Sequence, residues 1–480
     1  MIRTSQTCNT PRATLQHKRS YATSISAGSY SFGQPVHETH PHLLDPGELT
    51  PGITAQEYAD RRTTLASKLP KNAIAILSAA DTVFRSGNVF YPFYQDPDFY
   101  YLTGFNEPEA LCVVGKDVTE RDHVFHLYVR EKDSKAEMWD GARSGTDAAR
   151  DVWNADETGD IANIKTLLPD IVGEATVVYT DILKEDVHQS TLSRFLNGAQ
   201  RKKQGEIAEI IPASKVRSLR PLMNDLRIFK SPAEVECMGL AGRASGLAHT
   251  DAMRSTFTTE RDLHAYLSYR QISYGCDSSA FEPVVAGGQN ALSIHYVRND
   301  DVLQPEDMVL VDGGGKYGGY VADITRTFPV DGRFSDAQRD LYTAVLNVQK
   351  TCISLCRGSA ELSLDKLHSI AENQFVEQLK GIGFDLSDKG IEKLFPHHLS
   401  HYLGLDVHDC IGYSRKTVLR EGHCITIEPG IYVPDDERWP KHFRGMGIRI
   451  EDSIAVHEDE CTVLTREAAK EITQIEALRS

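Results

Sequence analysis

The apolar positions in the first half of the chain predict short strands separated by helices. Residues 55–69 carry apolar side chains at helical spacing. Apolar runs of strand length follow at residues 73–80, 110–114, 124–129 and 175–179. Because strands that alternate with helices are typical of α/β domains, we expect a compact α/β domain over residues 38–217.

The second half begins with a strong signal for the start of a helix. Ser231 can act as the N-cap, Pro232 occupies the first turn, and Glu234 occupies the capping-box position. This helix should run to about Arg254, and the connection before it, residues 218–230, marks the domain boundary. Further capped helices are predicted at residues 335–356 and 363–379, with strands between and after them. We therefore expect a second domain over residues 218–480 and the fold class α/β (α+β).

The composition argues against two classes of protein. The hydrophobic fraction of 40 % is ample for large cores, yet no apolar run in the sequence is long enough, at about 18 residues, to span a membrane. The net charge of −16 argues against a surface that binds nucleic acid. The nine cysteines are scattered without a CxxC pair, which is typical of free thiols in a reducing compartment.

The first 37 residues have the composition of an organelle presequence. They contain no Asp or Glu, and Arg3, Arg12, Lys18 and Arg19 lie among many Ser and Thr residues. A disordered tail without a targeting role is the alternative interpretation. We therefore set residues 1–37 aside as a mitochondrial presequence and disordered lead.

Residues 308–328 predict two strands joined by a glycine-rich turn, with an aspartate on each arm. Asp312 ends an apolar run, where a carboxylate is costly unless it is paired or bound to a cation. Asp323 lies in the second arm, which is rich in β-branched and aromatic residues. The turn glycines allow positive φ angles, and they are Gly313, Gly314, Gly315, Gly318 and Gly319. Taken alone, two solvated aspartates at the end of a hairpin would explain this pattern equally well.

Four histidines lie close together downstream of this hairpin: His397, His398, His401 and His408. The apolar neighbours Leu403 and Leu405 favour neutral imidazole, which is the form that binds metals. A structural role is the alternative for any single histidine. Four of them in so short a stretch favour a functional site.

Other polar residues stand at the ends or on the faces of apolar strands. Glu428 ends a predicted apolar strand that begins at Cys424, and it repeats the pattern of Asp312. Arg449 and Glu451 share one face of the alternating stretch 447–456, although a surface ion pair is the alternative. His295 precedes the hairpin and could reach the same cavity.

Five residues in these segments are candidate metal ligands: Asp312, Asp323, His401, Glu428 and Glu451. Four carboxylates and one imidazole suit divalent ions such as Mn²⁺, Co²⁺ or Zn²⁺. Two such ions would balance the charge of four carboxylates, whereas one ion would leave an excess of two negative charges. Hydrolases with two metals hold the ions roughly 3.5–4 Å apart.

The segments DGGGKYGGYVADITRTFP, HHLSHYLGLDVHD, TIEPGIYV and GIRIED resemble the pita-bread metallopeptidases, in the branch of aminopeptidase P and prolidase. In the N-terminal half, HPHLL, PGELTPGI, DFYYLTGFNEPEA and EMWDGARSG are similar to the mitochondrial form of aminopeptidase P, the type of Xaa-Pro aminopeptidase 3 and the intermediate-cleaving peptidases. The resemblance covers about residues 38–470. It implies a creatinase-like α/β domain followed by a pita-bread catalytic domain. His398 departs from this pattern, because bacterial relatives usually carry Gly at this position. The substitution affects what can be expected of the local backbone shape and of the polarity of the pocket.

The resemblance implies a role for each candidate metal ligand. Asp312 binds one ion, Asp323 and Glu451 bridge both ions, and His401 and Glu428 bind the other. The ions would be Mn²⁺ in the first place, with Co²⁺ or Zn²⁺ as alternatives, and they would activate the attacking water. Glu428 would also act as the general base.

The resemblance also implies a substrate site beside the ions. His295 and His408 would steady the peptide and its carbonyl oxygen as charge develops. His397 and Arg449 would line the site, and Arg449 would also orient a carboxylate ligand. Phe281 falls where the family has an aromatic residue in the pocket for the N-terminal residue. The free α-amino group of the substrate should lie by the ion of Asp312.

We therefore expect an aminopeptidase that releases a single N-terminal residue from peptides or proteins. Its substrates would be presequence-processing intermediates that begin with Tyr, Leu or Phe, or chains that begin Xaa-Pro. Residues 19–22, Arg-Ser-Tyr-Ala, resemble the mitochondrial cleavage site that creates such an intermediate. A prolidase restricted to dipeptides and a non-catalytic pita-bread binding protein are the alternatives.

The remaining expectations concern location and assembly. We expect the protein in the mitochondrial matrix, free or associated with the inner membrane, with no transmembrane segment and no nucleic acid as a partner. A homodimer or homotetramer is expected, because relatives often assemble so that an N-terminal domain approaches a partner's site. Within the aromatic stretch of residues 90–102, Phe99, Tyr100 and Tyr101 are the candidates for that contact, although burial in a core is the alternative.

Overall fold

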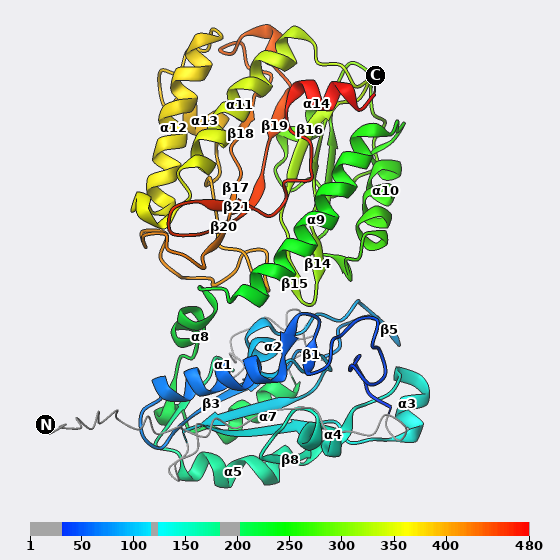
Figure 1. The fold of residues 1–480 in the computed structure, drawn as a ribbon, viewed down its shortest axis with the longest axis vertical. Coiled ribbons are helices and arrows are strands. Elements are labelled where there is room, and N and C mark those ends of the chain that lie inside the picture. Colours follow the sequence, from blue (N-terminus) through cyan, green and yellow to red (C-terminus); the bar gives the residue numbers. More distant parts are fainter. Residues whose placement is uncertain (1–30, 117–122, 183–201, 480) are drawn as a thin grey trace, which may run out of the picture.

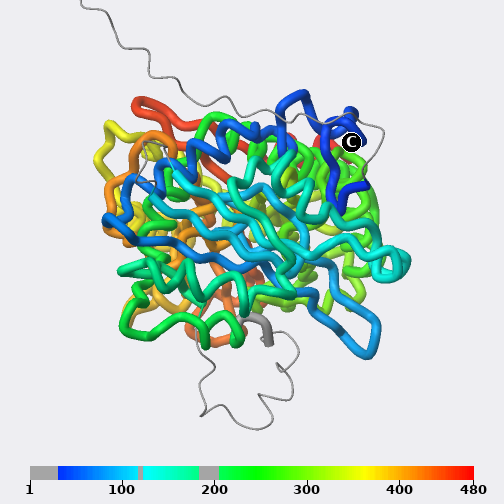
Figure 2. The backbone as a smooth tube through the Cα atoms, turned by 90° about the horizontal axis from the view of Figure 1, so that it is seen from below, coloured from blue at the N-terminus to red at the C-terminus, as the bar shows by residue number. Residues whose placement is uncertain are grey.

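The computed structural model describes residues 31–116, 123–182 and 202–479, and these residues form two stacked domains (Figure 1). Seen from below, the sheet and helices of the N-terminal domain lie across one end of the C-terminal domain (Figure 2). The sequence similar to a cleavage site, residues 19–22, lies outside the described residues. Within the described ranges, no helix is long and apolar enough to cross a membrane.

The N-terminal domain is built on a six-stranded mixed sheet with the order β10-β9-β3-β6-β7-β8. These strands are β3 (Ala73–Ser78), β6 (Leu111–Gly115), β7 (Val124–Val129), β8 (Glu157–Asp160), β9 (Val177–Tyr179) and β10 (Val216–Arg217). Because side chains alternate along a strand, the sheet has two apolar faces. The face that contains Ala75 packs against α1 (Ala55–Lys68), and the face that contains Ile76 packs against α5 (Ile164–Glu174) and α7 (Lys202–Ile210).

Shorter elements complete this domain: β1 (Glu48–Thr50), β2 (Ile53–Thr54), β4 (Phe84–Ser86), β5 (Val89–Phe90), α2 (Pro97–Thr103), α3 (Ser134–Asp140) and α4 (Gly145–Asp151). The predicted helix at residues 55–69 and the four predicted strands are confirmed within two residues at each end.

Small antiparallel sheets form the interior of the C-terminal domain, and long helices cover them (Figure 1). The strands are β11 (Ser278–Ser279), β12 (Val284–Gly287), β13 (Met308–Asp312), β14 (Gly315–Tyr317), β15 (Tyr320–Val321), β16 (Thr325–Pro329), β17 (Cys424–Ile427), β18 (Gly430–Tyr432), β19 (Gly447–Arg449), β20 (Asp452–Val456) and β21 (Cys461–Val463). The helices are α8 (Arg220–Arg227), α9 (Pro232–Arg254), α10 (Glu260–Ser273), α11 (Asp336–Ser354), α12 (Leu364–Gly381), α13 (Gly390–Leu394) and α14 (Ile472–Ala477). The predicted helix to Arg254 is confirmed, with a reciprocal capping box between Ser231 and Glu234.

The predicted aspartate hairpin is present, but its glycines have two different roles. Strands β13 and β16 pair antiparallel with Asp312 opposite Thr325, and β14 pairs with β15 beyond them. Only the tip, Gly318 and Gly319, has positive φ angles, of 58° and 91°. At Gly314 the reason for glycine is space, because a Cβ atom would lie 1.7 Å from the carbonyl oxygen of Ala322.

The folded part of the chain begins earlier than the predicted boundary at residue 37. The Gln34 side chain donates to the carbonyl oxygen of Gly104 at 2.9 Å, and Val36 is 1 % exposed in the core of the N-terminal domain. The sequence did not indicate this, because the segment lacks the periodicity of a helix or strand. Residues 34–37 therefore belong to the folded N-terminal domain and not to a disordered lead.

The aromatic residues proposed as a contact between subunits are buried inside the chain. Phe99 and Tyr101 lie in a core that also contains Tyr320 of the C-terminal domain. The Tyr100 hydroxyl donates to the carbonyl oxygen of Gly318 at 3.2 Å. These residues join the two domains of one chain, so the expectation that they contact a partner was wrong.

Candidate metal centre and active site

Three of the predicted ligands converge at one point in the C-terminal domain. Asp323, His401 and Glu451 each offer a ligand atom, and these atoms lie within 4.8 Å of one another. His401 Nε2 is 3.4 Å from Asp323 Oδ2 and 3.4 Å from Glu428 Oε1. The structure therefore brings together Asp323 and Glu451, which are more than 100 positions apart in the sequence.

Hydrogen bonds between separate sheets explain why the hairpin and the C-terminal strands meet at this point. The main-chain N–H of Asp323 donates to Ser453 Oγ at 3.0 Å, and the N–H of Glu451 donates to the carbonyl oxygen of Thr325 at 3.0 Å. On the opposite face of these strands, the fully buried Arg326 and Asp452 form an ion pair of 2.7 Å. Neighbouring residues of a strand face opposite sides. The ion pair therefore stabilises the strands on the face away from the site, while Asp323 and Glu451 face the site.

His401 is held in the tautomer that a metal ligand requires. Its Nδ1 lies 3.1 Å from the carbonyl oxygen of Tyr402, so Nδ1 carries the hydrogen and donates it. Nε2 then faces the carboxylates of Asp323 and Glu428. Burial lowers the pKa of His401, but the carboxylates of Asp323 and Glu428 outweigh burial and raise it to about 9. With cations in the site, that imidazole would bind an ion in place of a proton.

Asp312 has one satisfied carboxylate oxygen and one unsatisfied oxygen. Its Oδ2 accepts a hydrogen bond of 2.6 Å from Arg449 Nη2. Its Oδ1 is buried and has no hydrogen-bond partner. Burial raises the pKa of Asp312 to about 6 despite the guanidinium of Arg449. A buried acceptor without a donor is costly, and a cation at Oδ1 would remove that cost.

Glu428 and Glu451 each accept a hydrogen bond from the hydroxyl of a threonine. Thr426 Oγ1 donates to Glu428 Oε1 at 3.1 Å, and Thr325 Oγ1 donates to Glu451 Oε2 at 2.6 Å. Burial raises the pKa of Glu428 to about 7. Burial, and then the carboxylate of Asp323, raise the pKa of Glu451 well above its ordinary value. The four carboxylates therefore repel one another unless protons or cations lie between them.

These observations fit a centre for divalent ions. The unsatisfied oxygen of Asp312, the mutual repulsion of the carboxylates and the fixed tautomer of His401 all favour bound cations. Four carboxylates and one imidazole are the donors that Mn²⁺, Co²⁺ or Zn²⁺ accept.

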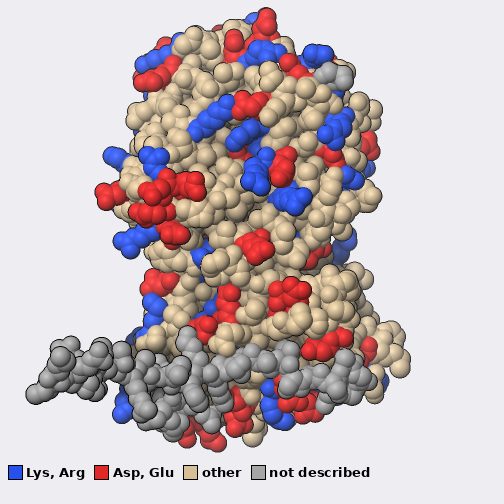
Figure 3. Space-filling view, viewed as in Figure 1, with Lys and Arg blue, Asp and Glu red and all other residues tan. Residues whose placement is uncertain are grey.

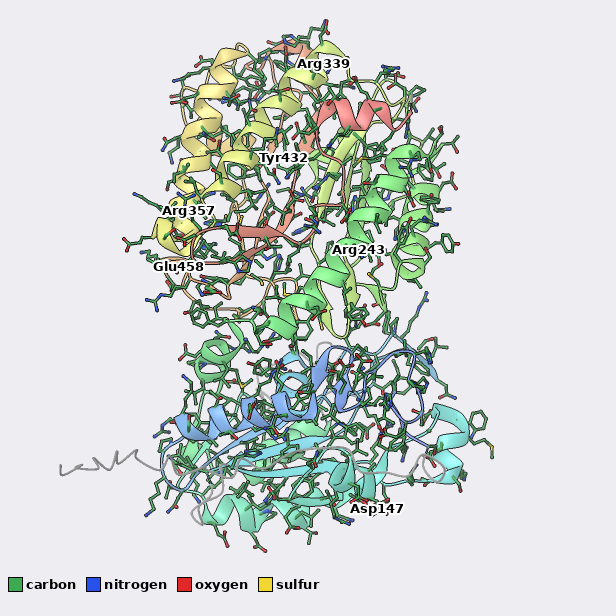
Figure 4. All side chains as sticks on the ribbon, viewed as in Figure 1. Asp147, Arg243, Arg339, Arg357, Tyr432 and Glu458 are labelled. Carbon is green, nitrogen blue, oxygen red and sulfur yellow. The ribbon has the colours of Figure 1, made fainter. Side chains whose placement is uncertain are left out.

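A second layer of hydrogen bonds extends from Asp312 through Arg449, which is 2 % exposed. Arg449 Nη1 donates to the Tyr432 hydroxyl at 2.6 Å, and that hydroxyl lies 3.0 Å from His397 Nε2. Figure 4 labels Tyr432 in the interior of the C-terminal domain. Burial lowers the pKa of His397 to about 3, so its imidazole is neutral and accepts the hydroxyl hydrogen. This layer fixes the side chains of His397 and Arg449 beside the metal donors.

The remaining predicted substrate residues lie nearer the surface. The His408 ring is 4.5 Å from the His401 ring, measured between centroids, and His408 is exposed. His295 is exposed in the turn after the 3-10 helix Gly288–Leu292, where it acts electrostatically on Asp312 and His408. Phe281 is half-buried between β11 and β12. No hydrogen bond, ion pair or ring contact of the described residues joins it to the metal donors.

His398 points away from this centre. Its ring stacks on His368 of α12 at 4.5 Å, and its Nε2 lies 3.3 Å from Asp365. Its Nδ1 lies 2.8 Å from the carbonyl oxygen of Ser400. The departure from the bacterial pattern therefore adds a contact with α12.

Sequence reasoning missed several residues that support the ligands, namely Thr325, Thr426, Tyr432 and Ser453. Position along the strands could have indicated some of them. Thr325 follows Asp323 by two residues and Thr426 precedes Glu428 by two, so each pair shares a strand face. Tyr432 had no such signal, because only the pairing of β18 with β19 brings it to Arg449.

Comparison with known proteins agrees with this site. Residues 236–458 match Metallopeptidase family M24, and residues 58–179 match Aminopeptidase P, N-terminal domain. The chain is 44 % identical over 467 residues to Intermediate cleaving peptidase 55 of Saccharomyces cerevisiae, covering 96 % of this chain and 91 % of that protein. It is 37 % identical over 472 residues to Xaa-Pro aminopeptidase 3 of Homo sapiens, covering 93 % of this chain and 90 % of that protein.

A solved structure extends the similarity to the fold. The crystal structure of Icp55 from Saccharomyces cerevisiae bound to apstatin inhibitor superposes with a TM-score of 0.77 at 40 % identity, covering 90 % of this chain and 99 % of that one. The chain therefore belongs to metallopeptidase family M24, as a metalloaminopeptidase with an aminopeptidase P N-terminal domain. The predicted fold and enzyme class are thus confirmed, and the non-catalytic alternative is set aside.

Proposed function

We propose that this enzyme releases single N-terminal residues from polypeptides in mitochondria at a centre of two divalent ions. The observation that carries this proposal is the cluster of Asp323, Glu428 and Glu451 about His401, together with the buried oxygen of Asp312 that has no partner. Asp323 and Glu451 would bridge the ions, Asp312 would bind one of them, and His401 and Glu428 would bind the other.

Bound ions would polarise the scissile carbonyl and lower the pKa of an attacking water. The chain supplies the proton transfers. Glu428 lies among the donors, 3.4 Å from His401, and can accept the proton of the water and pass it to the leaving nitrogen. The proton therefore moves from water to a carboxylate and then to the new amino terminus of the product.

The remaining residues orient the substrate. Burial lowers the pKa of His408, so its imidazole is neutral and can donate one N–H to the carbonyl oxygen as negative charge develops. We assign the same function to His295. His397 and Arg449 would line the site, Phe281 would contact the first side chain, and the substrate amino group would lie by Asp312.

The relatives support a role in processing mitochondrial polypeptides. One is named an intermediate cleaving peptidase, and the Arabidopsis thaliana relative carries the word mitochondrial in its name. We propose the matrix as the location, Mn²⁺ as the metal, and a homodimer or homotetramer as the assembly. The substrates would be presequence intermediates that begin with Tyr, Leu or Phe, and Xaa-Pro chains are a second class because another relative is a Xaa-Pro aminopeptidase.

The test is an assay of the purified chain with Mn²⁺ on peptides that begin Tyr-Ala, Leu-Ala or Xaa-Pro, with mass spectrometry of the products. Release of the first residue is expected, and Asp312→Ala should abolish it. Cleavage of dipeptides alone would favour the prolidase alternative. N-terminal sequencing gives a second test: the mature chain should begin at Ala22 in the wild type and at Tyr21 in Asp312→Ala. If no peptide loses its first residue, the proposal fails.

A further inference from the structure

His295 stands on a segment with little regular structure. Residues 288–301 follow β12 and contain one short 3-10 helix, Gly288–Leu292. We call residues 288–301 the His295 loop. Helix or strand hydrogen bonds do not fix the main chain at His295, so other contacts have to hold this residue in place.

One buried side chain, that of Glu260, supplies such contacts. Glu260 is the first residue of α10 and is fully buried. Its Oε1 accepts hydrogen bonds from the main-chain N–H of Gly287 at 2.8 Å and from Asn290 Nδ2 at 2.9 Å. Its Oε2 accepts from the Tyr296 hydroxyl at 2.8 Å and from the main-chain N–H of Asp301 at 2.9 Å. A single carboxylate therefore bonds to both ends of the His295 loop and to two residues within it.

The main chain of Glu260 also bonds to this loop. Its N–H donates to the carbonyl oxygen of Asp301 at 3.0 Å, so the main chain and the side chain of Glu260 hold the same residue. A buried carboxylate is costly unless it is hydrogen-bonded, and the four donors to Glu260 satisfy both of its oxygens. Glu260 is thereby fixed as firmly as the loop that it holds.

Tyr296 carries this support to His295. The two residues are adjacent, so the position of Tyr296 sets the main chain from which the imidazole extends. The Tyr296 side chain packs against the buried apolar cluster that contains Tyr432, and Tyr432 bonds to Arg449 beside the metal donors. Tyr296 is therefore held at its hydroxyl by Glu260 and along its ring by residues that also support the metal site.

We propose that Glu260 is a positioning residue, which fixes the His295 loop so that the His295 imidazole stands where the substrate carbonyl will lie. This inference rests on the proposed function, in which His295 steadies the carbonyl oxygen as negative charge develops. His295 acts electrostatically on Asp312 and His408, so it lies near the metal donors. A misplacement of about 1 Å can cost a reaction about a hundredfold in rate, so the support of the loop matters for catalysis.

The test combines Glu260→Gln with His295→Ala. In Glu260→Gln an amide NH₂ group replaces one carboxylate oxygen and faces the donors of the loop, so the loop loses part of its support. We expect kcat to fall between about tenfold and about a hundredfold with KM retained, because His295 would act on charge that develops only in the transition state. In the His295→Ala background the same substitution should change kcat by less than about twofold. An equal loss in both backgrounds would show a merely structural role and would overturn the inference.

Tyr296→Phe is the second variant, and it keeps the inference testable if Glu260→Gln does not fold. It removes the hydroxyl that donates to Glu260. We expect a smaller fall in kcat, which should again vanish in the His295→Ala background. Asp336→Asn and Tyr269→Phe are the matched controls and should keep the wild-type kcat, because Asp336 is the exposed first residue of α11 and Tyr269 is 63 % exposed on α10.

Hydrogen–deuterium exchange measures the loop without turnover. The amides of residues 287–301 should exchange faster in Glu260→Gln than in the wild type, while the amides of α11 should not change. Unchanged exchange of residues 287–301 would overturn the inference, and so would a wild-type kcat in both variants of an active enzyme. A wild type that releases no residue from any peptide would instead overturn the proposed function.

Discussion

Arg449 donates to Asp312 at 2.6 Å while the other carboxylate oxygen of Asp312 remains buried without a partner. This arrangement orients one metal donor before any ion arrives. The guanidinium also donates to Tyr432 and Thr325, so all of its nitrogens have partners. Asp312 is thereby held with its free oxygen available for a cation.

Replacing Arg449 with Met should release Asp312 from this position. The buried carboxylate loses its cation partner, which costs about 3–5 kcal/mol when one member of a buried ion pair is removed. We expect a lower Tm, weaker Mn²⁺ binding by isothermal titration calorimetry, and loss of most activity. Arg243→Met, an exposed arginine of the same domain that Figure 4 labels, is the control and should change none of these. Unchanged Mn²⁺ affinity in Arg449→Met would contradict the proposed role.

Removing the metal should destabilise the enzyme, and removing one carboxylate should reverse part of that effect. Ions present at a hundred times their Kd stabilise a protein by about 2.7 kcal/mol, so chelation should lower Tm and Mn²⁺ should restore it. In Glu451→Gln one repelling carboxylate is gone, while Thr325 keeps an acceptor. The apo form of this variant should therefore melt higher than the apo wild type and should respond less to Mn²⁺. Thermal unfolding with and without EDTA measures both, and an unchanged response to Mn²⁺ would exclude Glu451 as a ligand.

Acid should weaken the buried ion pairs that Asp409 forms with Arg227 and Lys230. Burial would raise the pKa of this carboxyl, but Arg227 and Lys230 outweigh burial and lower the pKa to about 2. Lys230 Nζ lies 2.9 Å from its Oδ2. Because the folded pKa is below the unfolded value of about 3.9, this stabilisation is full above pH 4 and is lost as the pH falls from about 4 to about 2, on the order of 2 kcal/mol.

Chemical denaturation between about pH 7 and about pH 3 checks this, because the free energy of unfolding of Asp409→Asn should be lower at neutral pH and should fall less in acid than that of the wild type. The exposed Asp147→Asn serves as the control and should follow the wild-type curve. A parallel fall in Asp409→Asn would show that other carboxyls cause the acid sensitivity.

Substituting Gly314 should disrupt the hairpin, because a Cβ atom would lie 1.7 Å from a main-chain oxygen that cannot move aside easily. We expect Gly314→Ala to lose about 3 kcal/mol of stability or more, or to yield no soluble protein. Gly239 in α9 is the matched control, because a Cβ atom there has nothing within 4 Å. Gly239→Ala should gain about 0.5–1 kcal/mol from helix propensity. Equal stability of the two variants would contradict the close packing at Gly314.

Charged side chains of both signs are mixed on the surface of the molecule. Figure 3 shows acidic and basic side chains interspersed over the visible face. Acidic residues are in excess over the whole chain, which has a net charge of −16. The eight described cysteines are all free, as expected of a chain in a reducing compartment.

The sequence alone determined the elements and the donor types. Periodicity and caps predicted α1, α9 and α11, because these signals are local and act before the chain is compact. The chemistry of Asp312, Asp323, His401, Glu428 and Glu451 was also readable, since carboxylates at the ends of apolar strands are costly without a cation.

The tertiary structure decided the rest. Pairing of β18 with β19 brought Tyr432 to Arg449, and packing against α12 set the direction of His398. Tertiary contacts also decided which glycines need space and which need a positive φ angle, and they buried Phe99 and Tyr101 between the domains. These features depend on contacts between residues that are far apart in the chain, and local sequence patterns do not predict such contacts.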